Sequence, residues 1–192
     1  MPSQTTSQPS ARERLLAAAD ELFYEEGVHT VGIDRIIERA GVAKATLYST
    51  YGSKDELVRS YLTRRHEARV ARLTGAVGQY TDPRDRLLAI FESLEKTVAR
   101  HGFRGCAFVN ASAEASAGGA VAEVSARSRS WTRDLFTTEA AAAGVAAPAA
   151  LAEQLVMLYD GAMVAAQMDQ NPKAAGAARV MAALLIDTAP RA

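Results

Sequence analysis

The chain has 192 residues, a formal net charge of zero, 48% hydrophobic residues and 6% aromatic residues. This length can bury a sizeable core in one or two domains, but the balanced charge excludes a global electrostatic attraction to nucleic acid. The single cysteine, Cys106, excludes an intrachain disulfide and fits a reducing compartment.

Residues 1–9 are expected to form a disordered tail. The first ten residues are polar and uncharged, and they lack the basic and apolar regions of a signal peptide. No stretch has the roughly 18 consecutive apolar residues of a membrane span. We therefore expect a cytoplasmic protein with no membrane partner.

The alanine-rich sequence, in which apolar residues recur about every 3.6 residues, predicts an all-α fold of about nine helices. Capping boxes at Ser10 and Ser53 and an Asp82-Pro83 pair mark helix starts. Helices are expected from Ser10 to Gly27, over 33–40 and 43–50, from Ser53 to near Gly75 or Gly78, and over 83–100, 106–114, 120–143, 148–169 and 172–188. They group into a compact N-terminal domain (10–55) and a larger helical bundle (56–192).

The two short helices that meet at Gly41 predict a helix-turn-helix, which lays its second helix in a DNA major groove. Leu47 and Tyr51 are expected to pack inward with Val42. The side chains expected to face DNA or its backbone are Lys44, Thr46, Tyr48, Ser49, Thr50 and Lys54. The alternative is an ordinary helical hairpin whose exposed residues have no binding role.

Local charge favours the DNA-binding interpretation. Between Arg35 and Arg72 there are nine Lys or Arg residues and four Asp or Glu residues. Because phosphate contacts need local positive charge, we expect a basic zone around the two short helices and the helix after them.

Residues 10–62 resemble the N-terminal domain of the tetracycline-repressor (TetR) family of bacterial transcription regulators. The resemblance rests on about twenty positions, which include Ala17, Ala18, Leu22, Phe23, Gly27, Ile36, the run from Ala40 to Tyr48, and the run from Tyr51 to Leu57. It implies three DNA-binding helices, then a ligand-binding and dimerisation bundle. It also implies a homodimer that binds a double-stranded, pseudo-palindromic operator.

Carried over by position, the resemblance implies base contacts from Lys44, Ala45, Thr46, Tyr48 and Ser49, and phosphate contacts from Tyr48, Thr50 and Lys54. Three departures leave the operator sequence unpredictable. Gly32 stands where a Ser or Thr often touches phosphate, so only its backbone N–H is offered. Ala43 replaces a frequent helix-capping Ser, and Ser49-Thr50 replaces a common aromatic-His pair.

The bundle is expected to hold an unidentified small-molecule effector. Residues 104–114 resemble a segment that lies near the effector pocket in one branch of the family. Candidate ligand contacts are Phe91, Phe103, Cys106, Phe108, Asn110, Trp131, Met157 and Met163. The alternative for each of these residues is core packing. Cys106 has two further interpretations: a redox-active thiol beside the positive charge of His101 or Arg104, or an inert buried thiol.

Small-residue faces on the last two long helices (148–169 and 172–188) predict close packing, and the resemblance implies that they form the dimer interface. No phosphate-binding glycine loop is present, and three histidines leave little for metal or acid–base chemistry. We therefore expect no enzyme, no cofactor and no metal. The expected function is a ligand-responsive repressor; the alternative is a ligand-binding or redox-sensing helical protein without specific DNA binding.

Overall fold

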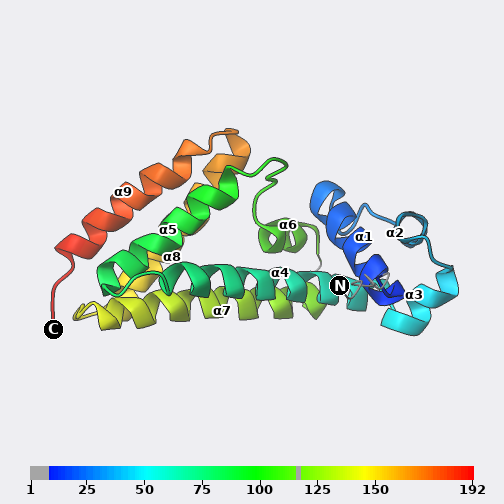
Figure 1. The fold of residues 1–192 in the computed structure, drawn as a ribbon, viewed down its shortest axis with the longest axis horizontal. Helices are drawn as coiled ribbons and strands as arrows, with labels where there is room; N and C mark the ends of the chain where they lie inside the picture. Colours follow the sequence, from blue (N-terminus) through cyan, green and yellow to red (C-terminus); the bar gives the residue numbers. More distant parts are fainter. Residues whose placement is uncertain (1–8, 116–117) are drawn as a thin grey trace, which may run out of the picture.

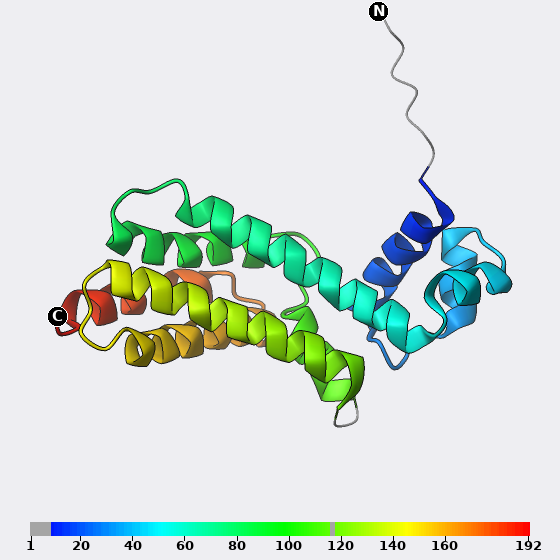
Figure 2. The ribbon, with the colours of Figure 1, turned by 90° about the horizontal axis from the view of Figure 1, so that it is seen from below.

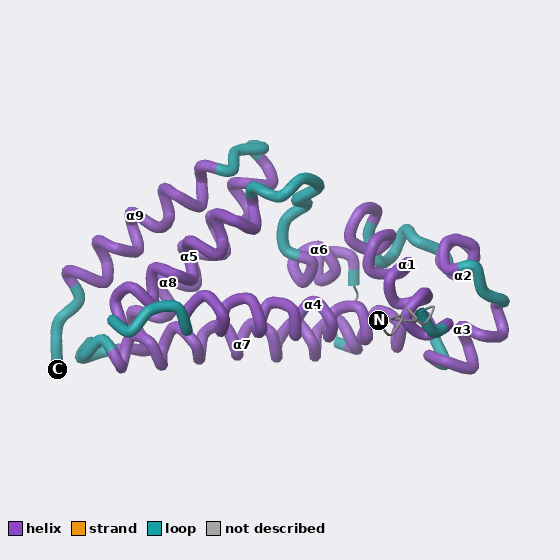
Figure 3. The backbone as a smooth tube through the Cα atoms, in the orientation of Figure 1, coloured by secondary structure: helices purple, strands orange, loops and turns teal. Residues whose placement is uncertain are grey.

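The structure is a computed structural model that describes residues 9–115 and 118–192. Within these ranges there are nine α-helices and no strand, apart from an isolated antiparallel bridge between Val145 and Arg191. The all-α prediction is confirmed, and Figure 3 shows helices joined only by loops. The predicted disordered tail, 1–9, lies outside the described residues except for Pro9. The helices are α1 (Ala11–Glu26), α2 (Ile33–Ala40), α3 (Lys44–Tyr51), α4 (Lys54–Val77), α5 (Pro83–Val98), α6 (Ala107–Glu114), α7 (Gly119–Ala142), α8 (Pro148–Met168) and α9 (Lys173–Thr188).

Side-chain caps begin helices close to where the sequence predicts them. The N–H of Glu13 donates to the Ser10 hydroxyl at 3.2 Å, and the N–H of Ser10 donates to the Glu13 carboxylate at 2.7 Å, which completes the first capping box. At α4 the Ser53 hydroxyl accepts from the N–H of Glu56 at 3.1 Å. The Glu56 carboxylate pairs with Arg59 instead of returning to Ser53, so the second cap is one-sided.

The helices form two parts that α4 connects (Figure 1). We call residues 10–53, with α1–α3, the head, and residues 54–192, with α4–α9, the body. In both views α4 leaves the head and runs beside α7 through the body (Figures 1 and 2). Helix α6 packs against α7 and α4 at the end of the body near the head (Figure 1). The predicted domain boundary at residues 55–56 falls within the first turn of α4.

Large aliphatic side chains from all four of the first helices make the core of the head. Leu15 and Leu22 on α1, Ile36 on α2, Leu47 on α3 and Leu57 on α4 are all buried. Burial of such a side chain contributes roughly 1.5–3 kcal/mol. The short helices α2 and α3 are therefore held by tertiary packing, because helices of this length are unstable alone.

The core of the body contains an aromatic cluster. Phe91 on α5, Phe136 on α7 and Tyr159 on α8 are buried, with ring centroids 5.8–6.3 Å apart. Tilted and edge-on pairs at this distance add to the stability that burial gives. Phe91, a predicted ligand contact, is fully buried in this cluster, as the core-packing alternative describes.

The small residues of α8 and α9 pack within the chain. Ala162 and Ala166 on α8 and Ala175, Ala178 and Ala182 on α9 are all buried. Their small side chains allow the two helices to approach closely. The predicted close packing is present as an intrachain contact.

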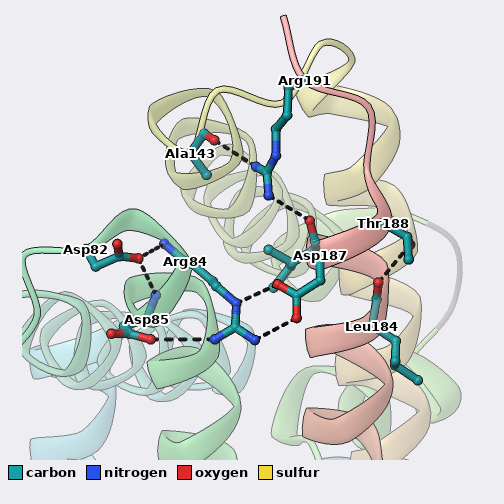
Figure 4. Close-up of polar contacts among 9 residues, drawn as sticks. Asp82, Arg84, Asp85, Ala143, Leu184, Asp187, Thr188 and Arg191 are labelled. Atoms are coloured by element: carbon teal, nitrogen blue, oxygen red, sulfur yellow. Dashed lines mark hydrogen bonds and ion pairs between the residues drawn. The ribbon is translucent and has the colours of Figure 1, made fainter.

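Polar contacts join the ends of α5 and α9 at the part of the body farthest from the head (Figures 1 and 4). Asp82 caps α5 by accepting from the N–H of Arg84 at 2.8 Å. The Arg84 guanidinium then pairs with both oxygens of Asp187 on α9, at 2.5 and 2.7 Å. Arg191 donates to the Ala143 carbonyl at 2.8 Å, which ties the C-terminal residues to the end of α7.

Helix α8 has the length and apolarity that a membrane-crossing helix needs, with a mean hydropathy of 1.2 over its most apolar 18 residues. It packs between α7 and α9, and 44% of that window is buried in the body. A core helix of a bundle has the same length and composition, and the packing of α8 matches that assignment.

Candidate nucleic-acid interface and adjoining cavities

Within the head, helix α3 is held against its neighbouring helices by the side chains of Leu47 and Tyr51. Leu47 is fully buried, and Tyr51 is buried with its hydroxyl donating to the Arg12 carbonyl at 3.0 Å. The Arg12 guanidinium lies 4.9 Å above the Tyr51 ring. These contacts confirm the predicted inward face, and the opposite face of α3 is left to solvent.

Four predicted DNA contacts lie on the exposed face of α3: Lys44, Ala45, Tyr48 and Ser49. Tyr48 is 46% exposed, so its ring and hydroxyl are accessible to a partner. The four positions have the spacing i, i+1, i+4 and i+5, so they form one continuous surface.

Two hydroxyls of α3 already donate hydrogen bonds within the helix. Thr50 is half-buried, and its hydroxyl donates to the Thr46 carbonyl at 2.6 Å within the helix. The exposed Ser49 hydroxyl donates to the same carbonyl at 3.1 Å. A bond to a phosphate, which only accepts, must therefore replace a bond already made inside the helix, whereas a base amino group can still donate to either hydroxyl.

Lys44 has an acidic partner in the head. Its ammonium nitrogen lies 3.0 Å from a carboxylate oxygen of Asp34 on α2, and both side chains are exposed. The hydrogen bond to Asp34 raises the pKa of Lys44 and the nearby carboxylate charge adds to this effect. Asp34 was missed by sequence reasoning, although its place in the first turn of α2 put a carboxylate close to the interface.

Lys54 and Gly32 border the same surface. The Lys54 ammonium donates to the His29 carbonyl at 3.3 Å, and Lys54 is the first residue of α4. Gly32 precedes α2 as its exposed N-cap and makes no side-chain cap. Ala43 likewise begins α3 without a side-chain cap, as predicted.

The head is less basic than the count over residues 35–72 indicates. Arg35 pairs with Glu26 and Arg39 pairs with Glu21. Both glutamates lie on α1, outside the counted segment, so the sequence window omitted the charges that offset these arginines. The unpaired positive charge is instead concentrated farther along α4.

The body contains a cavity of about 280 Å³ among α4, α6, α7 and α8, which we call the inner cavity. Its walls include apolar and hydroxyl side chains together with two arginines, among them Arg69, Cys106, Phe108, Ser128, Arg129 and Thr132. Asp160 also lines it and pairs with Arg129 at 2.7 Å. An apolar cavity with a few polar groups is typical of a small-molecule site.

Arg69 is the polar centre of this cavity. Its guanidinium donates to the Ser128 hydroxyl at 3.4 Å and to the Cys106 sulfur at 3.3 Å, and it lies 4.8 Å from the centre of the Phe108 ring. Sequence reasoning assigned the charge beside Cys106 to His101 or Arg104, and the structure places Arg69 there instead. The missed signal was the spacing of Arg65, Arg69 and Arg72, which puts three arginines on one face of α4.

Four of the predicted ligand contacts lie beside cavities. Cys106 and Phe108 line the inner cavity. They also line a neighbouring cleft of about 300 Å³, together with Phe103 and Met163. Cys106 is only 8% exposed, as the buried-thiol alternative describes.

The other predicted contacts lie elsewhere. Phe91 belongs to the aromatic cluster, and Trp131 packs edge-on against His66, with ring centroids 6.1 Å apart. The Asn110 amide donates to the Arg104 carbonyl at 2.8 Å and so holds the loop before α6. Met157 is 71% exposed and lies outside the described cavities, so its predicted ligand contact has no support in this geometry.

The segment that borders the inner cavity also contacts the head. The Tyr24 hydroxyl on α1 accepts from the N–H of Arg104 at 2.9 Å and donates to the Gly105 carbonyl at 3.1 Å. At the other end of this segment, the Glu114 carboxylate accepts from the N–H of His29 at 2.8 Å. No periodic pattern could reveal these contacts, because the partners lie about 80 residues apart in the chain.

In the described parts of the chain, no group of three or more His, Cys, Asp or Glu side chains lies close enough to hold a metal ion. Glu26 and His29 have the Glu-x-x-His spacing of a metal-binding motif, but Glu26 pairs with Arg35. The fold and the exposed face of α3 define a helix-turn-helix DNA-binding protein with a separate helical body.

Comparisons with known proteins agree with this class. The family described as "Bacterial regulatory proteins, tetR family" matches residues 15–61. A TetR-family transcriptional regulator from Streptomyces coelicolor is 35% identical, with a TM-score of 0.89, over 93% of this chain and 95% of that chain. A regulator of the same kind from Streptomyces avermitilis is 31% identical, with a TM-score of 0.86, over 96% of this chain and 100% of that chain. The chain belongs to the TetR family of transcriptional regulators.

Curated relatives match over only part of this chain. The transcriptional activator FasR of Mycolicibacterium smegmatis is 42% identical over 82 residues, which cover 43% of this chain and 37% of FasR. The transcriptional repressor NemR of Escherichia coli is 31% identical over 113 residues, 56% of this chain and 55% of NemR. The chain thus spans about half or less of these relatives, one of which is an activator and the other a repressor.

Proposed function

We propose that this regulator is a repressor that binds a pseudo-palindromic operator as a homodimer and is released by a small-molecule effector. The observation that carries the proposal is the continuous exposed face of α3, formed by Lys44, Ala45, Tyr48 and Ser49. In this proposal these residues contact base edges, with Thr46 beside them at the rim. Tyr48, Thr50, Lys54 and the N–H of Gly32 contact phosphates.

A dimer through α8 and α9 is supported by their outer surfaces. Six of the large apolar side chains that are exposed in the described residues lie on these two helices: Met157, Val164, Met168, Val180, Met181 and Leu184. An exposed apolar group of this size favours association with a second copy. Met157 is thus proposed as a dimer contact in place of a ligand contact.

The effector is proposed to bind in the inner cavity. Residues 103–114 border this cavity and also hold the head, through Tyr24 and through Glu114. A ligand that binds better when this segment is displaced shifts the dimer toward a conformation with the heads mis-spaced. Spacing matters because successive half-sites on one DNA face are about 34 Å apart.

Fluorescence anisotropy with labelled DNA from the region flanking the gene tests operator binding. The expected result is saturable binding that exceeds binding to scrambled DNA of equal length and weakens steeply with salt. Equal binding to both DNAs would reject sequence-specific recognition. A reporter driven by the same region separates repression from activation, because deletion of the gene should raise expression from a repressed promoter.

The alternative function is redox or ligand sensing through Cys106 without specific DNA binding. The Arg69 guanidinium 3.3 Å from the sulfur favours it, and the burial of Cys106 opposes it. Intact-protein mass spectrometry after peroxide treatment tests this alternative. Oxidation of wild type but not of Cys106→Ser would support it, and an unmodified thiol would remove it.

A further inference from the structure

The cleft beside the inner cavity is unusually rich in arginine. It has a volume of about 300 Å³ and lies among α1, α4, α5, the loop before α6, and α8. Four arginines line it, Arg65, Arg69, Arg72 and Arg100, and no acidic residue does. We call it the arginine cleft.

Three of these arginines have no carboxylate partner. All 22 Asp and Glu residues of the chain lie in its described parts, and none comes within 4.0 Å of a guanidinium nitrogen of Arg69, Arg72 or Arg100. Arg72 donates to the Ser93 hydroxyl at 2.8 Å, and Arg69 donates to a hydroxyl and a thiol. None of these partners is a carboxylate, so no carboxylate within 4.0 Å offsets the charges of these three arginines, although Asp160 acts on Arg69 from farther away.

Uncompensated charge in a partly buried cleft is costly for the folded protein. Arg69 and Arg72 are only partly accessible, so water screens their mutual repulsion less than it would on an open surface. Several other half-buried arginines of this chain are paired with a carboxylate: Arg65 makes two bonds to Asp20, at 2.7 and 2.8 Å, and Arg86 reaches Glu139 at 2.8 Å. Arg14 instead donates to two backbone carbonyls. The arginine cleft is distinct because it gathers three arginines without a carboxylate partner in one place.

We propose that the arginine cleft binds a small, multiply charged anion that carries phosphate or carboxylate groups. Guanidinium groups bind both kinds of oxyanion through paired hydrogen bonds, and three unpaired guanidiniums match a ligand with at least two negative charges. The exposed Arg100 stands at the entrance, and Arg69 and Arg72 are the deeper contacts.

The cleft also touches the connection between head and body. Arg65 lies 4.2 Å from the centre of the Tyr24 ring while it pairs with Asp20, and both partners belong to α1. An anion in the cleft is thus adjacent to the contact through which the body holds α1. The site goes beyond the proposed function, since its occupation does not require operator DNA, although it shares Arg69, Cys106 and Phe108 with the inner cavity.

Isothermal titration calorimetry on the full chain tests the proposal with two probes, sodium pyrophosphate and sodium citrate, at ionic strength held constant with sodium chloride. Binding of pyrophosphate alone assigns phosphate chemistry, and binding of citrate alone assigns carboxylate chemistry. Arg100→Gln is expected to weaken binding roughly tenfold or more, because a charge-assisted hydrogen bond is lost. The matched control, Arg133→Gln, removes the same charge from an exposed position on α7 outside the cleft and should bind as wild type does.

A second variant, Arg72→Gln, should weaken binding in the same way, with its fold checked by circular dichroism. If it fails to fold, Arg100→Gln still tests the site, because its side chain is exposed. The proposal is overturned if neither probe binds above the chloride background, or if Arg100→Gln and Arg133→Gln weaken binding equally. Loss of operator binding with anion binding intact would count only against the proposed repressor.

Discussion

The head and the body of this regulator differ in where they place polar side chains and exposed apolar side chains. The head buries aliphatic side chains such as Leu47 and leaves Lys44, Tyr48 and Ser49 on its surface. The body places Arg69 in the wall of two cavities and leaves the apolar side chains of Met157 and Met168 exposed. The head is therefore built to meet a polar, charged partner, and the body to enclose a ligand and meet an apolar one.

The DNA-facing residues of the head could be predicted from the sequence more completely than the cavity residues of the body. The DNA-facing residues lie within one short segment, so helical spacing alone assigns them to faces. The cavity residues come from α4, α6, α7 and α8, and only the packing of these helices brings them together. Substitutions in the head and in the body should therefore have different effects on DNA binding and on stability.

The largest effect is expected from removing core volume in each part. Leu47→Ala in the head and Leu87→Ala in α5 of the body both truncate fully buried leucines, so each should lower the free energy of unfolding by about 2–5 kcal/mol. Denaturant titration followed by circular dichroism measures this loss. Operator binding should be lost in Leu47→Ala and retained in folded Leu87→Ala; equal binding by both variants would show that α3 does not read DNA.

A smaller effect is expected from the exposed face of α3. Tyr48→Ala should weaken specific operator binding by about 1–3 kcal/mol with little change in melting temperature, because the side chain is 46% exposed. Anisotropy titration measures the affinity. The matched control is Tyr80→Ala, which removes another exposed tyrosine, from the loop before α5. Wild-type affinity in Tyr48→Ala would contradict the assigned face.

Breaking the Lys44–Asp34 pair should raise DNA affinity, whereas Tyr48→Ala should lower it. Asp34→Asn frees Lys44 and removes a negative charge near the phosphates, so DNA affinity should rise by roughly twofold to fivefold. The dependence of affinity on salt concentration should also become steeper. Glu38→Gln on the same helix is the charge-matched control, because Glu38 makes no ion pair in the described residues. A fall in affinity in Asp34→Asn would show that this carboxylate positions Lys44 productively.

The smallest effect is expected from a histidine in the body. Burial lowers the pKa of His66 below its usual 6.5, and the charges of Arg127 and Arg69 lower it further. The Nδ1 atom is buried without a hydrogen-bond partner in the described part of the chain, and the ring packs on Trp131. The folded state thus resists protonation.

Because the unfolded chain binds this proton more readily, His66 stabilises the fold at pH above about 6.5 relative to lower pH. That contribution is lost as the pH falls from 6.5 toward the lowered pKa of the folded state. His66→Gln should flatten the fall in unfolding free energy between pH 7.5 and 5.5, measured by urea titration. His101→Gln, at an exposed position, serves as control. An unchanged slope in His66→Gln would reject the assignment.

Much of the fold was predictable because its signals are local. Ser10 and Glu13 lie three residues apart, so their reciprocal capping is visible in the sequence and present in the structure. Helix α2 begins and ends as predicted, and α3 begins and ends one residue later than expected. The inward placement of Leu47 and Tyr51 is confirmed because a helix fixes which side chains share a face.

The body site was less predictable because apolar residues of core and cavity look alike in sequence. Phe91 and Phe108 have the same side chain, but one fills the aromatic cluster and the other borders the inner cavity. The alanines of α8 and α9 predict close packing, yet sequence does not say whether the neighbour belongs to the same chain. Buried Ala178 and exposed Met181 separate the two surfaces only once the helices are docked.

The sequence by itself determined the helices, the head and the face of α3, because capping and helical periodicity act over a few residues. The tertiary structure alone decided that Asp34 would meet Lys44, that Glu114 would hold the head at His29, and that four arginines would line a cleft that no carboxylate lines. These contacts depend on which helix surfaces meet, and that outcome follows from the packing of the whole chain.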